Sequence, residues 1–123
     1  WWTICVPPEW WAEREDDSVI ISDRDQVGSI EFSTLRKEAG EFAADEVAAI
    51  ARDNGEPGWQ WQDVAAGEFS GVGCAYQEDG DAVREWYLAA GPLLLFVTYS
   101  CDIENGALDE AAVDEILSTL ALA

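Results

Sequence analysis

Histidine is absent from this sequence of 123 residues, and basic residues of any kind are scarce. Without histidine the chain lacks the commonest general base and metal ligand, and it can form neither a Ser-His-Asp nor a Cys-His arrangement. No phosphate-binding glycine motif is present either, because Gly71-Val72-Gly73 lacks a third glycine and lies in a strand-like pattern. These absences exclude several large classes of enzyme, and we predict no cofactor and no metal site.

Long apolar runs are missing as well. No stretch of about 18 apolar residues occurs, so the sequence predicts no membrane-spanning helix. The chain starts at Trp1 without a basic leader segment, which fits either a processed mature form or a trimmed chain. A cytoplasmic location is favoured, and a processed envelope protein is the alternative.

Positively charged residues are scarce. The chain has 26 acidic residues against 6 basic ones, a net charge of −20, and Lys37 is its only lysine. Binding to nucleic acid depends on Lys and Arg side chains that release counterions from phosphates, so this composition argues against such a partner. The same charge repels anionic membrane surfaces. A basic protein partner, a cation site, and a solvated surface suited to high salt remain as explanations.

The cysteines are few and odd in number: Cys5, Cys74 and Cys101. Their spacing matches no metal-binding motif, and they cannot all pair within one chain. We expect them to be small buried hydrophobic residues, with a Cys5–Cys101 disulfide as an open alternative.

Hydrophobic patterning predicts the secondary structure. Seven strands are expected, over residues 1–6, 18–22, 29–35, 59–64, 71–77, 82–89 and 93–101. Residues 9–17 are expected to form a connection. Helices are expected over residues 43–54 and from an N-cap at Asp109 to residue 121, the second with an apolar stripe made of Val113, Ile116, Leu117 and Leu120.

The last strand, residues 93–101, is apolar on both faces and must therefore be covered on both faces. It should lie near the centre of the sheet, as the third member of a meander with the two strands before it. The expected fold is α+β: an α/β/α sandwich with a central, mostly antiparallel sheet of about seven strands, two helices and the order βββ-α-ββββ-α. The whole chain, residues 1–123, is expected to be a single domain.

Two acidic turns carry a weak calcium-loop pattern: Asp23-x-Asp25-x-x-Gly28 and Glu78-Asp79-Gly80-Asp81. Neither has the longer loop between helices, or the distal glutamate, of an EF-hand. We expect ordinary turns, the second of them a tight hairpin because it contains an Asp-Gly pair.

Seven tryptophans are many for a chain of this length. Trp2, Trp59, Trp61 and Trp86 fall in strand patterns and are expected to pack in the core. Trp10 and Trp11 are adjacent in an extended segment, so their side chains point in opposite directions, and we do not expect both to be fully buried. They are the candidate binding residues, with simple packing as the alternative.

Carboxylates are the remaining source of chemistry. Glu31, Asp63 and Glu85 interrupt strand patterns, so each lies either on the solvent side of its strand or in an acid–base site. An acid–base role requires one of them to be buried with a raised pKa.

Several short motifs together resemble the PsbP-like fold group of small bacterial domains. They are packing motifs spread over nearly the whole length: Val6-Pro7-Pro8-x-Trp10, Ile30-x-Phe32-Ser33, Gly71 with Tyr76, Arg84-Glu85-Trp86-Tyr87, Gly91, and Leu94-x-Phe96-x-Thr98-Tyr99. The group includes an extrinsic photosystem II subunit, a nuclear-transport protein that binds a small GTPase, and bacterial envelope lipoproteins. The resemblance implies an α/β/α sandwich, no shared active site, and action by binding other proteins.

These observations together predict a non-catalytic protein-binding or accessory domain, inhibitor-like or immunity-like, whose partner is another protein with a basic surface. The alternatives are a small carboxylate-dependent enzyme that uses Glu31, Asp63 or Glu85, and an acidic domain that binds a cation or small ligand.

The net charge generates the first testable prediction. Salt screens the repulsion between surface carboxylates, over about 8 Å at physiological ionic strength, so NaCl should raise the melting temperature. A thermal melt followed by circular dichroism across a range of NaCl concentrations measures this. A melting temperature that does not rise with salt would contradict the view that self-repulsion destabilises the fold.

Overall fold

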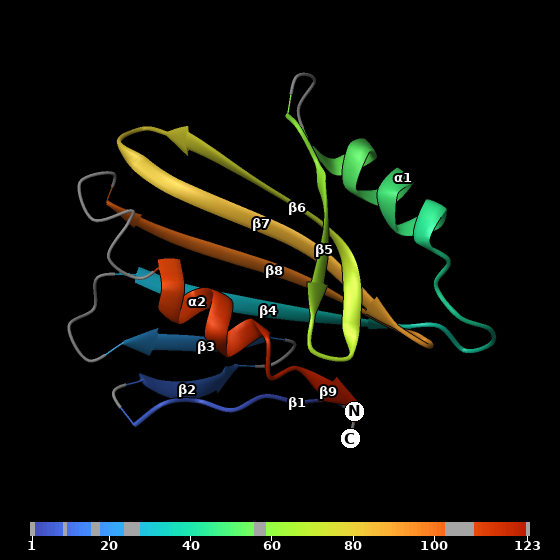
Figure 1. Cartoon of the computed structure of the whole chain (residues 1–123), viewed down its shortest axis with the longest axis horizontal. Helices are drawn as coiled ribbons and strands as arrows, with labels where there is room; N and C mark the ends of the chain where they lie inside the picture. The colour runs from blue at the N-terminus through green and yellow to red at the C-terminus, as the bar shows by residue number, and fades with distance from the viewer. Residues whose placement is uncertain are drawn as a thin grey trace.

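The computed structural model describes residues 2–8, 10–15, 18–23, 28–55, 59–102 and 110–122. Figure 1 shows the twisted central sheet, with the helix α2 in front of it and the helix α1 at the right of the view. The architecture is α+β, as the sequence predicts.

The central sheet has seven strands, and every neighbouring pair is antiparallel. In spatial order the strands are β2 (Trp10–Glu15), β3 (Ser18–Asp23), β4 (Gly28–Arg36), β8 (Leu93–Asp102), β7 (Asp81–Ala90), β6 (Phe69–Glu78) and β5 (Gln62–Ala66). Strand β8 therefore occupies the middle position, which confirms the prediction from its doubly apolar pattern. Strands β6, β7 and β8 form the predicted meander.

One face of the sheet, the α2 face, carries the larger core. The helix α2 (Glu110–Leu117) packs here, together with a small two-stranded sheet of β1 (Trp2–Thr3) and β9 (Ala121–Leu122). Every residue of the predicted helical stripe is buried, as are Leu95 and Val97 beneath it. The indole of Trp2 packs on Phe32 and donates a hydrogen bond of 3.0 Å to Thr34, which fixes the small sheet to β4.

The opposite face, the α1 face, is covered over part of its width. The helix α1 (Ala44–Asn54) buries Val47 and Ala51 against Val72, Tyr87 and Leu94. Because Leu94 and Leu95 are consecutive in β8, their side chains point to opposite faces, so α1 and α2 lie on opposite sides of the sheet. The helices thus complete the expected three-layer arrangement.

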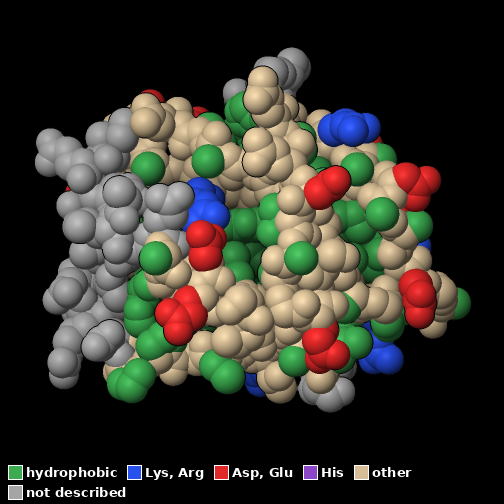
Figure 2. Space-filling view, viewed as in Figure 1, with side chains coloured by type: hydrophobic (Ala, Val, Ile, Leu, Met, Phe, Trp, Pro, Cys, Tyr) green, Lys and Arg blue, Asp and Glu red, His purple; other side chains and the backbone are tan. Residues whose placement is uncertain are grey.

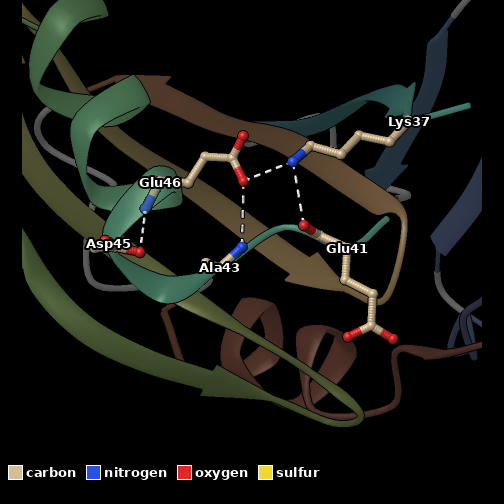
Figure 3. A network of polar contacts seen from close by, with 5 residues as sticks. All are labelled: Lys37, Glu41, Ala43, Asp45 and Glu46. Carbon is tan, nitrogen blue, oxygen red and sulfur yellow. Dashed lines mark hydrogen bonds and ion pairs between the residues drawn. The ribbon is translucent and has the colours of Figure 1, made fainter. Parts of the chain in front are cut away.

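The start of α1 is held by a polar network around the single lysine (Figure 3). The ammonium of Lys37 lies 2.7 Å from Glu46 Oε1 and donates to the carbonyl of Glu41 at 3.1 Å. Glu46 also accepts a bond from the backbone N–H of Ala43, the residue before the helix. These two hydrogen bonds, from Lys37 first and Ala43 second, lower the pKa of Glu46. The network closes an otherwise unpaired helix end.

Two expectations for the N-terminal region are wrong. The expected strand over residues 1–6 shrinks to the two residues of β1, and it joins the small sheet rather than the central one. The expected connection over residues 9–17 contains β2, which forms one edge of the central sheet. The dense charges of this segment are typical of an edge strand facing water, which is why its pattern does not look like that of a buried strand.

Two boundaries also differ from prediction. Strand β5 begins at Gln62, so Trp59 and Trp61 precede it instead of lying within it. The helix α2 ends at Leu117, and the chain then turns into β9 rather than continuing as helix to residue 121. Ser118 and Thr119 cap this end by donating their hydroxyl groups to the carbonyls of Glu115 and Ile116, and such local bonds compete with helical ones.

The turn between β6 and β7 is the predicted hairpin. Asp79 and Gly80 form its two-residue loop, and both have positive φ angles, of 51° and 85°. This backbone suits an Asp-Gly pair and matches the twist of the flanking strands. The other acidic turn, between Asp23 and Gly28, lies largely outside the described residues. None of the helices in the described ranges is long and apolar enough to cross a membrane.

The three cysteines are free thiols and differ in burial. Cys101 is buried and Cys74 is half-buried, but Cys5 is exposed, contrary to the expectation for all three. The reason is that Cys5 belongs to the segment after β1, which leaves the sheet, and its backbone N–H bonds to Thr119 Oγ1 at 2.9 Å.

Burial on both faces of β8 generates the second prediction. Leu95 is fully buried in the centre of the core, so Leu95→Ala should lower the free energy of unfolding by about 2–5 kcal/mol. Leu35→Ala is the matched control, because Leu35 is 58% exposed and its loss should change stability by less than about 0.5 kcal/mol. Urea unfolding followed by tryptophan fluorescence measures both. Equal effects of the two changes would contradict the central position of β8.

Candidate functional site

A pocket of about 500 Å³ opens on the α2 face, where β5 begins beside the middle of β6. Figure 2, seen from the same side as Figure 1, shows this face hollowed near its centre, with hydrophobic side chains in the depth. Three neighbouring strands and the segment before β5 contribute the lining, which consists of Trp59, Gln60, Gln62, Val64, Gly73, Cys74, Ala75, Tyr76, Arg84 and Trp86.

Small residues of β6 make the floor of the pocket. Gly73 and Trp86 are cross-strand partners, and a methyl group at Gly73 would lie 2.7 Å from Trp86 Cδ1 and 3.2 Å from Val64 Cγ2. Glycine therefore lets the indole of Trp86 lie close to the backbone of β6. Ala75, the next residue of β6 on the same face, is also small. The hollow exists because these two positions lack large side chains.

Arg84 supplies the positive charge of the pocket. Its guanidinium lies over the ring of Trp86, 4.6 Å from the ring centroid, and donates through Nη2 to Asp114 Oδ1 of α2 at 2.8 Å. Its other terminal nitrogen, Nη1, is buried and has no hydrogen-bond acceptor among the described residues. A buried charged donor without an acceptor costs free energy. An acceptor atom brought by a ligand would be stabilised here once the neighbouring side chains move aside, because Nη1 itself has almost no exposed surface.

A second cluster lies at the rim, on the other side of β6. The hydroxyl of Tyr76 donates a hydrogen bond to Glu85 Oε2, and Cys74 is the cross-strand partner of Glu85. Burial, followed by the charge of Glu85, raises the pKa of the Cys74 thiol to about 11. Burial, followed by the hydrogen bond to Glu85, also raises the pKa of Tyr76. Both groups are thus neutral near pH 7, and Glu85 has a fixed donor.

Aromatic rings connect this rim to the core beneath α1. The ring of Trp59 stacks on Tyr76 with centroids 4.2 Å apart, and Trp61 meets the edge of Tyr87 at 5.7 Å. Tyr87 in turn stacks on Phe96 at 4.8 Å. Because offset-stacked and edge contacts of this kind stabilise ring positions, the segment before β5 is held at the pocket mouth.

The predicted binding residues lie elsewhere. Trp10 is 8% exposed and belongs to the core of the α2 face, whereas Trp11 is 39% exposed on the α1 face. Their opposite directions confirm the argument from adjacency, and neither residue lines the pocket. A binding role for Trp11 stays a prediction.

The three candidate carboxylates share the α1 face, and two of them come near each other. Glu31 and Glu85 are both cross-strand partners of Thr98, so their Cα atoms are about 10 Å apart, two strand spacings. Asp63 lies on β5, opposite Val72, and is exposed, as is Glu31. Only Glu85 is partly buried, and it contacts the pocket through Cys74 and Tyr76. Across the described part of the chain, no cluster of three metal-ligating residues occurs.

The sequence reasoning missed Arg84 as a functional residue. Its signal was a single arginine at a position of β7 that shares a face with Ala82 and Trp86, where an apolar residue would be expected. A charge on the core face of a central strand is unusual, and this alone could have marked the site.

The fold resembles two solved bacterial structures. A protein from Bacteroides thetaiotaomicron VPI-5482 matches the whole chain with a TM-score of 0.74 and 18% identity, and the match spans 45% of that protein, so the present chain is less than half its length. LpqN, which is involved in cell envelope biogenesis of Mycobacterium tuberculosis, matches 98% of the chain and 82% of its own length, with a TM-score of 0.60 and 16% identity. Neither a protein-family model nor a curated protein matches the sequence. Identities this low establish a shared fold and nothing further.

The environment of Cys74 generates the third prediction. At about pH 8 its reaction with a disulfide reagent should be about tenfold slower than that of an ordinary thiol. The thiolate is about a hundredfold rarer, and the greater nucleophilicity of the more basic thiolate offsets about tenfold of this. Glu85→Gln removes the repelling charge and should speed the reaction. Asp63→Asn is the matched control on the same face and should leave the rate unchanged. The rates are measured in a Cys5→Ser background, which leaves only Cys74 and the buried Cys101. A Cys74 thiol that reacts equally fast in all variants would contradict the contact with Glu85.

Proposed function

We propose that this chain is a non-catalytic accessory domain of the PsbP-like kind, which binds a basic partner protein at the pocket beside β5. The observation that carries the proposal is Arg84, which lines a pocket with aromatic and amide walls and whose buried Nη1 atom has no acceptor among the described residues. A polypeptide offers both a carbonyl acceptor for this atom and an apolar side chain for the walls.

The charge distribution supports a protein over a small anion. Arg84 is the only basic residue among the described residues that line the pocket, and Asp114 already neutralises part of its charge. The surrounding net charge of −20 would repel a free anion and attract a basic protein. Charge steering of this kind acts mainly on the association rate and on the choice of partner.

The fold likeness adds a biological setting. LpqN is involved in cell envelope biogenesis. The PsbP-like group, which the sequence motifs resemble, includes envelope lipoproteins. We therefore propose that the partner is a protein of a bacterial envelope. The likeness itself concerns the fold and carries no site residue over to this chain.

A carboxylate-dependent enzyme is the second candidate, and Glu85 is the observation that favours it. This residue is partly buried, holds a hydrogen bond from Tyr76 and adjoins the pocket rim. It ranks second because Glu31, the nearest of the other candidate carboxylates, is exposed and separated from Glu85 by a full strand.

The experiment is capture of partners by the immobilised domain from a lysate of its source, at low and at high NaCl concentration. We expect a stoichiometric protein that is lost at high salt. Arg84→Gln should weaken its binding about tenfold or more, the usual effect of losing a hydrogen bond to a charged group. Arg52→Gln, which removes the same charge from an exposed position of α1, is the matched control.

Each variant must keep its circular dichroism spectrum and melting temperature for the comparison to count. A partner bound equally well by both variants would place the binding surface away from the pocket. No partner at either salt concentration would favour the enzyme candidate, which is then tested through Glu85→Gln.

A further inference from the structure

The outer edge of β6 is open beyond the end of β5. Strand β5 pairs with β6 only as far as Gly73, and β6 continues to Glu78. Figure 1 shows this last part of β6 along the rim of the sheet, with no described strand outside it. A strand edge of this kind presents backbone N–H and C=O groups to any chain that lies beside it.

The hairpin between β6 and β7 decides which of these groups point outward. Glu78 and Asp81 close its two-residue loop, and the closing pair of such a hairpin is hydrogen-bonded across the strands. Because hydrogen-bonded and non-hydrogen-bonded pairs alternate along an antiparallel ladder, Tyr76 and Cys74 also direct their backbone groups toward β7. Ala75 and Gln77 therefore direct theirs toward the open edge.

The hairpin between β5 and β6 leads independently to the same result. Ala66 and Phe69 close its loop, so the pairs that exchange hydrogen bonds with β5 are those of Phe69, Gly71 and Gly73. The backbone N–H and C=O groups of the odd-numbered residues of β6 thus point toward its outer edge along the whole strand. An added strand would continue the line of β5 and bond to Ala75 and Gln77.

The pocket lies where such a strand would begin. Ala75 lines the pocket, and its cross-strand partner is Arg84. A residue placed opposite Ala75 on the added strand would direct its side chain over the α2 face, beside the guanidinium and the indole of Trp86. Its neighbours in the added strand would point to the other face, toward the stacked rings of Trp59 and Tyr76.

The charges at the far end of β6 select the occupant. Glu78, Asp79 and Asp81 are all exposed around the hairpin loop, at the end of the open edge away from the pocket. A second copy of this chain would bring the same carboxylates and a net charge of −20 against them. An extended segment with Lys or Arg residues would instead be attracted.

We propose that the open edge of β6 accepts an extended basic segment of a partner protein as an added antiparallel or parallel strand, with one apolar side chain in the pocket. Main-chain bonds to Ala75 and Gln77 supply affinity, and the pocket and the acidic loop supply specificity. This inference rests on the proposed function, and it specifies the form and chemistry of the bound segment.

The test is a selection of random peptides displayed on phage against the immobilised domain, followed by synthesis of the enriched peptides. We expect sequences with an apolar residue and Lys or Arg residues in an alternating pattern. In amide hydrogen exchange followed by NMR, the N–H groups of Ala75 and Gln77 should exchange rapidly in the free domain and at least tenfold more slowly with peptide bound. The amides of Cys74 and Tyr76 should be protected in both states.

Gln77→Pro is the decisive variant. Proline removes an N–H that faces the open edge and breaks no bond to β7, so the fold should persist while peptide binding falls at least tenfold. Gln77→Thr is the matched control, because it changes the same side chain and keeps the N–H. Should Gln77→Pro fail to fold, peptides N-methylated at alternate backbone positions test the same bonds on the unaltered domain, and one of the two methylation patterns should abolish binding.

Three outcomes would overturn the inference. If the selection enriches no basic peptide, the proposed occupant of the edge, a basic segment, is wrong. Peptides that bind Gln77→Pro and the unaltered domain equally would move the contact away from the edge, and would leave the proposed binding function intact. Self-association in sedimentation, with Ala75 and Gln77 already protected without peptide, would assign the edge to a second copy of the chain.

Discussion

The burial of β8 on both faces is the constraint on which the other layers depend. Leu95 and Val97 are covered from the side of α2, and Leu94 is covered by α1. A strand of this kind cannot lie at an edge or carry helices on one side only, because half of its apolar surface would then meet water. The helices consequently pack on opposite faces, and the polar strands β2 and β5 are left for the edges.

The short edge strand β5 creates the site. Because β5 begins at Gln62, the end of β6 has no outer neighbour among the described strands, and the chain before Gln62 crosses toward the α1 face, where Trp59 stacks on Tyr76. The α2 face is left hollow over Gly73 and Ala75, the two smallest residues of that part of β6. The guanidinium of Arg84 occupies the position that an apolar core residue would otherwise fill. The open edge follows from the short length of β5, and the partly buried charge of Arg84 lies in the pocket beside it.

The acidic surface acts on this site from a distance. A net charge of −20 favours basic partners wherever they bind, so charge by itself selects the chemistry of a partner but no location. In the described part of the chain, the location is set by two short-range features: the backbone groups of β6 that have no strand beside them, and the Nη1 atom of Arg84, which has no acceptor. In the proposed binding mode, the field of the domain attracts a basic chain and the backbone of β6 binds it.

The sequence by itself determined the fold class, the central position of β8, the helix α1 and the Asp-Gly hairpin, because each depends on a local period or on turn chemistry that neighbouring residues specify. It did not reveal β2, because the charged residues of this strand show no apolar alternation. It also did not reveal how short β5 is, because Trp59 and Trp61 continue a strand-like alternation before Gln62, where the pairing begins. The site was equally hidden. Arg84 is far in the chain from Trp59 and Gln62, and only the pairing of β5, β6 and β7 brings it beside them. Pockets form between elements and depend on register that no single segment encodes.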